Sequence, residues 1–458
     1  MTRNFKATCR ASCAGLAVAL GVLATPVHAG QFQLRWDHTN STVSADISEA
    51  PVRQVLEQIQ IATGWDVFVE PGFNSPISTT FTDLKTGRAL SRLLGNANFA
   101  VVPGDNKSTQ LMVFQTSKDR ATEKLLVSAI DPEDVRRIED ELLITVGSKE
   151  EAEKLAKEFG AEIIGEIPEM GTYRLKFKDA ESADKAKAKL EQREGVTVDS
   201  NYEISRPSNA QPLMGSQVPL PQIRPGKNSG DQLIIGLVDT SIQLPGGPLG
   251  DFFLAPISVA GAANPSGEVP THATSMANDI LFSMEAIVGM GGAANAKILS
   301  VDVFGAGADT TTFQLGQGLV EAWNNGATVI NASLGSKAPS PWLDTIIDQL
   351  TSQGALILGP SGNVPDGLPT YPAANPNMLA VTATAPGGGY APYANVAPWV
   401  DVSMPGNSIV TLTGRAYFVT GTSSATAKAT GSIAGYMLQT GGTPQDGRRF
   451  LIQARGIK

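Results

Sequence analysis

Short apolar segments alternate with helical segments throughout residues 231–458. The apolar segments read QLIIGLVD, AKILSVDVF, ATVINAS, ALILG and MLAVTAT, and the stretch TTFQLGQGLVEAWNNG between two of them has helical periodicity. Continuous apolar runs of this length are typical of strands buried on both faces, as in a parallel sheet covered by helices. The sequence therefore predicts an α/β fold for residues 231–458, with a mostly parallel sheet and helices on both faces.

Two small α+β domains are expected ahead of this region. Within residues 41–116, DISEAPVRQVLEQIQ has apolar residues at helical spacing, and WDVFVEP, FAVVP and QLMVF read as strands. Residues 121–205 hold 21 acidic and 13 basic residues, and their pattern gives the order βαββαβ of a ferredoxin-like unit. Residues 206–230 contain five prolines and few charges, so we expect an exposed linker there.

The N-terminus has the pattern of a secretory signal peptide. Three basic residues precede an apolar stretch from Ala14 to Ala24, and Val27-His28-Ala29 supplies a small-residue cleavage site. The alternative is a retained membrane anchor, but the apolar stretch is too short to span about 30 Å of hydrocarbon. We therefore expect residues 1–29 to be removed on export.

Removal of residues 1–29 would take both cysteines, Cys9 and Cys13, with it. The exported chain would then have neither a disulfide nor a thiol nucleophile. Its net charge of -9 argues against a phosphate-neutralising surface, so nucleic acid is not an expected partner.

Three separated polar residues of the α/β region could carry chemistry together. Asp239 ends the apolar run LIIGLVD, where a carboxylate can orient a histidine, bind a ribose or cap a helix. No glycine-rich G-x-G-x-x-G loop follows it, which weakens a dinucleotide site. His272, which follows the expected helix cap Thr271, could be a surface residue or a general base.

Ser423 lies at the start of a helix made of small residues, in GTSSATAKATGS. As an N-cap alone it would stabilise the helix by roughly 1 kcal/mol, and Thr, Asp or Asn would serve equally well. As a nucleophile it would need a base, a carboxylate that orients the base, and donors for an oxyanion. His272 and Asp239 could supply the first two, and Asn363 in GPSGNVPDG could supply an amide donor.

The order Asp, His, Ser and the contexts GLVDTSI, HATSMA, SGN and GTSSATA resemble those of the subtilisin-like serine proteases, or subtilases. This resemblance implies a triad of Asp239, His272 and Ser423, with Asn363 in the oxyanion hole. VINASLGS is similar to the family's substrate-lining strand, which implies a cleft wall formed by Ser333, Leu334 and Gly335. The family's calcium sites cannot be mapped onto this sequence, so we assign no metal and no cofactor.

Four positions depart from the family's motifs. Ser241 and Ala273 replace glycines, Ser275 replaces a second histidine, and Ala427 replaces a proline. None of these changes removes a member of the expected triad. They change the packing around it, and therefore bear on catalytic efficiency.

The two small domains have resemblances of their own. KEEAEKLAKEFGAEIIGEIPEMGTYRLKF resembles the inhibitory propeptides of subtilases, which implies that residues 121–205 fold onto the protease cleft. The alternative for this unit is a simple interaction domain. DISEAPVRQVLEQIQIATGWDVFVEP is similar to the short N-terminal domain of secretins and TonB-dependent transducers, although a generic spacer would fit as well.

The sequence as a whole predicts an exported serine endopeptidase made as a self-processed precursor. Its partners would be a protein or peptide substrate, its own propeptide, and a secretion or signalling component of a Gram-negative-type envelope, in which it would be periplasmic or secreted. The alternative is a catalytically weak or inactive envelope protein that binds peptides or docks to such a component.

Overall fold

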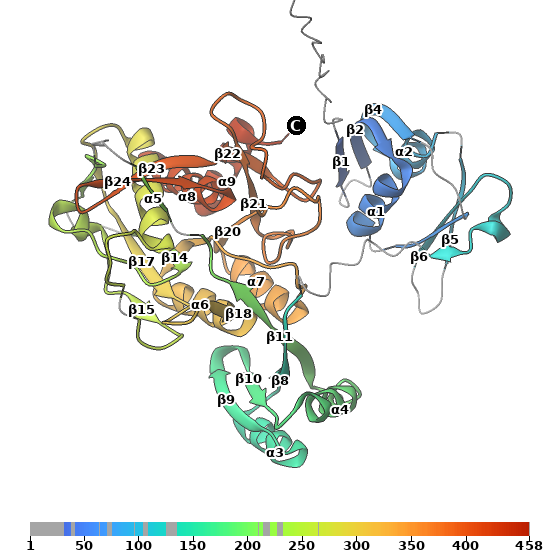
Figure 1. Ribbon diagram of the computed structural model, residues 1–458, viewed down its shortest axis with the longest axis horizontal. Helices are drawn as coiled ribbons and strands as arrows, with labels where there is room; N and C mark the ends of the chain where they lie inside the picture. The colour runs from blue at the N-terminus through green and yellow to red at the C-terminus, as the bar shows by residue number, and fades with distance from the viewer. Residues whose placement is uncertain are drawn as a thin grey trace, which may run out of the picture.

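The computed structural model describes residues 32–37, 42–63, 65–70, 76–95, 97–103, 109–124, 135–208, 210–213, 220–226, 232–263 and 265–457. The expected signal peptide, with Cys9, Cys13 and His28, lies outside these residues. Figure 1 shows three units along the chain: an N-terminal unit in blue, a middle unit in green, and a large C-terminal unit that runs from yellow-green to red.

The N-terminal unit has two small sheets, in the orders β1-β2-β4 and β5-β6-β3-β7, with two helices packed against them. Its elements are β1 (Phe32–Asp37), β2 (Thr42–Pro51), α1 (Val52–Thr63), β3 (Asp66–Val69), β4 (Pro76–Lys85), α2 (Thr86–Leu93), β5 (Asn98–Pro103), β6 (Thr109–Phe114) and β7 (Glu123–Lys124). The helices and strands expected from the sequence are present. The sheet that contains β1, β2 and β4 was not predicted.

The middle unit has the βαββαβ order that the sequence predicts. Its elements are β8 (Arg137–Thr145), α3 (Lys149–Phe159), β9 (Glu162–Ile167), β10 (Thr172–Lys176), α4 (Ala180–Leu190) and β11 (Thr197–Ser205). The sheet order is β18-β11-β8-β10-β9, so its outer strand, β18 (Asp309–Thr311), comes from the C-terminal unit. The two units therefore share one sheet.

The C-terminal unit is built on a seven-stranded sheet in the order β15-β17-β14-β19-β20-β21-β22, in which neighbouring strands are parallel. These strands are β14 (Leu233–Asp239), β15 (Ile257–Ser258), β17 (Ala296–Asp302), β19 (Ala327–Ala332), β20 (Leu356–Pro360), β21 (Leu379–Thr384) and β22 (Val402–Pro405). The sheet confirms the predicted α/β class.

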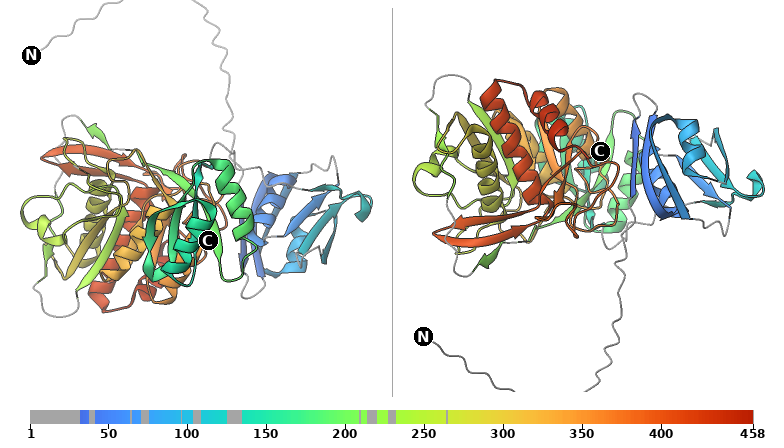
Figure 2. Two further views of the ribbon diagram at one scale, coloured as in Figure 1. Left: turned by 90° about the horizontal axis from the view of Figure 1, so that it is seen from below. Right: turned by 90° about the horizontal axis from the view of Figure 1, so that it is seen from above.

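Helices cover both faces of this sheet, as Figure 2 shows. α6 (Thr312–Asn324) and α7 (Pro341–Ser352) share one apolar cluster with the sheet. α5 (His272–Val288), α8 (Thr422–Thr440) and α9 (Pro444–Arg455) contribute to two other clusters. A hairpin of β23 (Asn407–Leu412) and β24 (Arg415–Thr420) leads directly into α8.

The prediction of an exposed linker over residues 206–230 is wrong for much of the part that the structure describes. β12 (Gln211–Leu213) pairs with β24, and β13 (Arg224–Pro225) pairs with β16 (Ala293–Ala294). Ala210 and Ile223 are buried in the same apolar cluster as α5. The prolines indicate irregular backbone, but they do not prevent the apolar residues between them from packing onto the C-terminal unit.

A buried polar network joins α5 to α8. The carboxylate of Asp279 on α5 accepts hydrogen bonds from Ser424 Oγ at 2.7 Å and Ser408 Oγ at 3.1 Å. Lys428 Nζ on α8 donates to the same Ser424 hydroxyl at 3.2 Å and to the carbonyl of Pro405 at 3.0 Å. Burial raises the pKa of Asp279 and lowers the pKa of Lys428, and each charge offsets part of the shift of the other.

We predict that Lys428→Met lowers the free energy of unfolding by about 3–5 kcal/mol, because it leaves the carboxylate of Asp279 buried without a cation. The loss should grow as the pH rises from about 4, since the substitution raises the folded-state pKa of Asp279 further above its unfolded value. Urea unfolding of the purified protein at several pH values measures both effects.

The double variant Asp279→Asn/Lys428→Met is the matched control, because it removes both charges and keeps similar side-chain volumes. It should recover most of the lost stability. A single variant as stable as the unaltered protein, or a double variant less stable than the single one, would show that the two charges do not compensate each other.

Candidate active site

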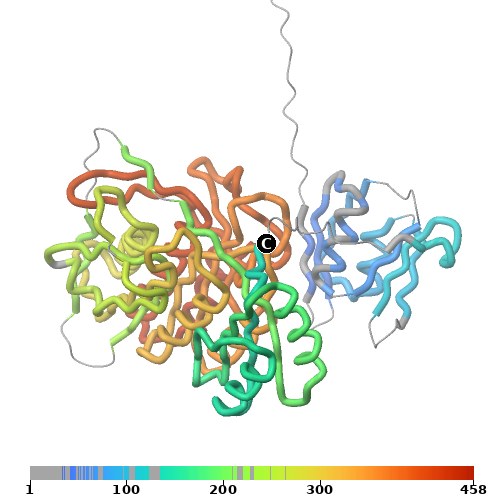
Figure 3. The backbone as a smooth tube through the Cα atoms, turned by 60° about the horizontal axis from the view of Figure 1, so that its bottom comes forward, coloured from blue at the N-terminus to red at the C-terminus, as the bar shows by residue number. Residues whose placement is uncertain are grey.

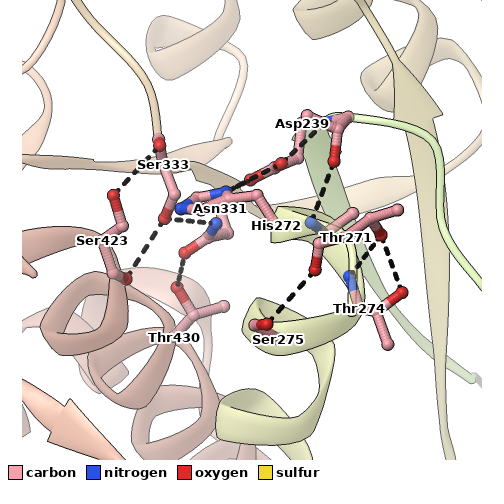
Figure 4. A network of polar contacts seen from close by, with 11 residues as sticks. Asp239, Thr271, His272, Thr274, Ser275, Asn331, Ser333, Ser423 and Thr430 are labelled. Carbon is pink, nitrogen blue, oxygen red and sulfur yellow. Dashed lines mark hydrogen bonds and ion pairs between the residues drawn. The ribbon is translucent and has the colours of Figure 1, made fainter. Parts of the chain in front are cut away.

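Asp239 and His272 form a buried pair at the carboxyl end of the central sheet. Asp239 is the last residue of β14 and is fully buried, and Thr271 caps α5 by accepting the N–H of Thr274, as predicted. His272 Nδ1 lies 2.9 Å from Oδ1 and 2.8 Å from Oδ2 of Asp239 (Figure 4). The carboxylate therefore fixes the orientation of the imidazole ring.

Ser423 is not the N-cap of its helix, so the capping interpretation is wrong. The N-cap is Gly421, whose φ of 148° suits glycine alone, and α8 begins at Thr422. Ser423 is the second residue of the helix, and its Oγ donates to the carbonyl oxygen of Ser333 at 3.2 Å. In the view of Figure 4 the ring of His272 lies between Asp239 on one side and Ser423 with Ser333 on the other.

Asn363 lies beside the start of α8. Its Oδ1 accepts hydrogen bonds from the backbone N–H and the hydroxyl of Thr422, both at 2.9 Å. A Cβ placed on Gly421 would lie 3.3 Å from Asn363 Nδ2, so the amide nitrogen is on the side of the helix entry. With its oxygen engaged, this side chain offers N–H donors next to Ser423.

The expected wall residues divide into two groups. Ser333 is buried next to Ser423: its Oγ donates to the carbonyl of Ser423 at 3.3 Å and accepts from Asn331 Nδ2 at 2.8 Å. The side chain of Leu334 is buried in the apolar cluster that it shares with α6 and α7. A Cβ on Gly335 would lie 2.5 Å from the carbonyl oxygen of Tyr371, so Gly335 is packed against that segment.

The departures from the family's motifs leave Asp239 and His272 in contact. The backbone N–H of Ala273 donates to Thr240 Oγ1 at 3.0 Å, and Ser275 Oγ donates to the carbonyl of Thr271 at 3.2 Å. Both bonds stabilise the first turn of α5 around His272. Ala427 is fully buried inside α8.

Sequence reasoning missed the charged residues around the site. Asp279 is the only charged residue in SMANDILF, and Lys428 is the only one in SATAKATG. A charge isolated among uncharged residues of a helix is a signal that could have identified both. Across the residues that the structure describes, no group of three or more His, Cys, Asp or Glu side chains is placed to hold a metal ion.

Comparison with known proteins gives two family matches. Residues 230–455 match the model of the subtilase family, and residues 129–198 match that of the fervidolysin N-terminal prodomain. An alkaline protease of Alkalihalobacillus alcalophilus is 36% identical over 165 residues, which are 36% of this chain and 43% of that protein. Subtilisin Savinase of Lederbergia lenta is 35% identical over 165 residues, or 36% of this chain and 61% of that protein. The chain therefore spans about half the length of these relatives.

Solved structures show the same fold at lower identity. Fervidolysin from Fervidobacterium pennivorans, described as a keratinolytic enzyme related to subtilisin, has a TM-score of 0.52 at 20% identity, over 67% of this chain and 55% of that one. An epidermin leader peptide processing serine protease from Staphylococcus aureus has a TM-score of 0.51 at 16% identity, over 68% and 92%. Residues 230–455 are a subtilase-family domain, and a region of the fervidolysin prodomain type precedes them.

Proposed function

We propose that the chain is an exported serine endopeptidase that hydrolyses peptide bonds and is made as a self-processed precursor. The observation that carries this proposal is the contact of His272 Nδ1 with both carboxylate oxygens of Asp239, at 2.9 and 2.8 Å. A proton held on Nδ1 leaves Nε2 free to accept the proton of Ser423 as it attacks a peptide carbonyl. Asp239 then stabilises the imidazolium that forms.

The entry of α8 supplies the environment for the oxyanion. Ser423 lies in the first turn of a 19-residue helix, where the helix dipole and free backbone N–H groups favour negative charge. Asn363 would donate to the same oxygen. In the resting state the Ser423 hydroxyl donates to the carbonyl of Ser333, so attack requires it to turn its hydrogen toward His272.

The middle unit is the expected propeptide, and it binds the C-terminal unit through two helix N-termini. Asn201 Oδ1 accepts the backbone N–H of Phe313 at 3.1 Å, and Asp199 Oδ2 accepts that of Trp342 at 3.1 Å. Each contact satisfies an otherwise unpaired donor in the first turn of α6 or α7. These contacts fix how the chain leaves β11.

Beyond β11 the chain continues to β12, which pairs with the strand that precedes Ser423. Ser205 pairs with Asp309 of β18, while Gln211 pairs with Phe418 of β24, the strand that leads to Ser423. Figure 3 shows this light green segment running from the middle unit toward the hairpin in red. His272 is only 4% exposed and Ser423 only 9%, which fits a site covered by the uncleaved chain. We infer that cleavage occurs between Arg206 and Gln211.

The first experiment is labelling of the purified exported protein and its Ser423→Ala variant with a fluorophosphonate, followed by measurement of both intact masses. We expect label on the unaltered protein alone, together with a new N-terminus between Arg206 and Gln211. The variant should keep its middle unit, because it has no activated hydroxyl with which to cut the chain.

The rival proposal is a catalytically weak or inactive protein that binds peptides. The observation in its favour is that Ser423 Oγ donates to Ser333 rather than to the imidazole. If the folded protein takes up no label although its middle unit has been removed, the rival is correct.

Asn363→Ala should lower kcat by about 100- to 1,000-fold, with a much smaller change in KM, because the amide acts on the oxyanion and not on the bound substrate. This magnitude comes from subtilisin itself. Steady-state kinetics on a peptide substrate measure both parameters.

The matched variant Asn363→Asp keeps the acceptor for Thr422 and removes the amide donors. It should be as slow as Asn363→Ala. If Asn363→Asp restores normal turnover, the role of Asn363 is to hold the start of α8 and not to bind the oxyanion.

Export and docking to a secretion or signalling component of the envelope belong to the same proposal. They rest on the signal-peptide pattern of residues 1–29 and on the resemblance of residues 41–116 to the short N-terminal domain of secretins and TonB-dependent transducers. Within the described part of the chain, no helix is both long and apolar enough to cross a membrane.

A further inference from the structure

The side chain of Arg206, at the end of the middle unit, lies in a recess of the subtilase domain. Its Nη2 donates to the carbonyl of Gly305 at 3.2 Å and also to that of Gly307. Its guanidinium carbon lies 5.2 Å from the centre of the Phe304 ring. The backbone N–H of Arg206 donates to Ala308 at 3.2 Å, so one segment, residues 304–308, contacts both its backbone and its side chain.

A buried carboxylate lies near enough to this guanidinium to feel its charge, although no hydrogen bond or ion pair joins them. Asp302, the last residue of β17, is 4% exposed, and its Oδ1 accepts the backbone N–H groups of Phe304 and Gly305 at 2.9 Å. Its Oδ2 has no hydrogen-bond partner within the described structure, and neither has the buried Nε of Arg206. Burial raises the pKa of Asp302, and the charge of Arg206 acts in the opposite direction.

The surroundings of Asp302 favour a cation. Asp239 on the adjacent strand β14 is directly opposite Asp302 in the sheet and adds a second negative charge. When the linker leaves, the recess loses Arg206 and keeps a buried carboxylate with an unpaired oxygen. A buried charge without a partner is costly, so the vacated recess should attract a positive side chain.

We propose that this recess is a subsite of the protease that selects an arginine side chain on the acyl side of the scissile bond. This inference rests on the proposed function, and Arg206 occupies the subsite in the precursor as a substrate arginine does after processing. The geometry suits a guanidinium better than an ammonium. A planar guanidinium with several N–H groups reaches two carbonyl oxygens while its face lies on Phe304, and it brings its positive charge near Asp302, which a compact ammonium cannot do in the same way.

The competing interpretation is that the recess only anchors the linker within the precursor. Measurements on the processed enzyme distinguish the two interpretations, because its recess no longer holds Arg206 and is free for a substrate. We would measure kcat/KM for a fluorogenic peptide of residues 203–211 and for two versions of it, Arg206→Gln and Arg206→Lys. Fluorophosphonate titration gives the concentration of active enzyme.

The processed enzyme should cleave the arginine peptide about 10- to 100-fold faster than the glutamine peptide, with the lysine peptide in between. Asp302→Asn, which can still accept the two backbone N–H groups through its side-chain oxygen, should reduce this ratio to about 3-fold or less. Phe304→Leu should reduce the ratio by a smaller factor. This variant takes the place of Asp302→Asn in the test if Asp302→Asn does not fold.

Asp309→Asn is the matched control, because Asp309 is an exposed carboxylate on the nearby strand β18. The ratio should stay the same in this variant. An equal loss of the arginine preference in Asp309→Asn and Asp302→Asn would overturn the proposal in favour of diffuse surface charge.

Two further outcomes are decisive. An enzyme that takes up the label but cleaves all three peptides equally well overturns the subsite and leaves the proposed function intact. A folded protein that takes up no label and cleaves none of the peptides overturns both.

Discussion

The close approach of α5 and α8 is the constraint on which the candidate site depends. A Cβ on Gly431 would lie 2.2 Å from the carbonyl oxygen of Ile280, and one on Gly435 would lie 2.7 Å from Ile287 Cβ. Because glycines stand at these crossings, the two helices pack in backbone contact. His272 at the start of α5 and Ser423 at the start of α8 are thereby brought to the same edge of the sheet. Asp239, the last residue of β14, lies at that edge.

The parallel sheet and the chain order Asp, His, Ser of the candidate catalytic residues could be predicted, because both follow from local sequence patterns. Apolar runs separated by helical segments specify buried strands, and Thr271 reads directly as a helix cap. The role of Ser423 could not be decided in this way. The backbone N–H of Thr422, one of the unpaired donors at the start of α8, is bound by Asn363, which lies 59 residues away in the chain, and local sequence does not report such a contact.

The linker, residues 206–230, also shows that local sequence does not report contacts with distant parts of the chain. Its five prolines and its lack of periodicity predict irregular backbone, and the described residues have only two short strands, but the predicted exposure is wrong for much of the described part, where Ala210 and Ile223 are buried. Exposure is decided by what the linker contacts, and its strand partners, β16 and β24, lie 69 and 203 to 207 residues further along the chain. A strand completed by a distant segment cannot be recognised from its own composition.

Three buried carboxylates surround the site, and each is compensated in a different way. Asp239 has the ring of His272, Asp279 has two serine hydroxyls and the charge of Lys428, and Asp302 has two backbone N–H groups and the charge of Arg206. The partners of the first two belong to the subtilase domain and would stay with it after the proposed cleavage. Arg206, whose charge acts on Asp302, lies on the prodomain side of the proposed cleavage site. Processing at the proposed site would therefore remove the charge that compensates Asp302 and leave the partners of the other two buried carboxylates in place, and the resulting unpaired charge would be next to the residues proposed to bind and cut a substrate.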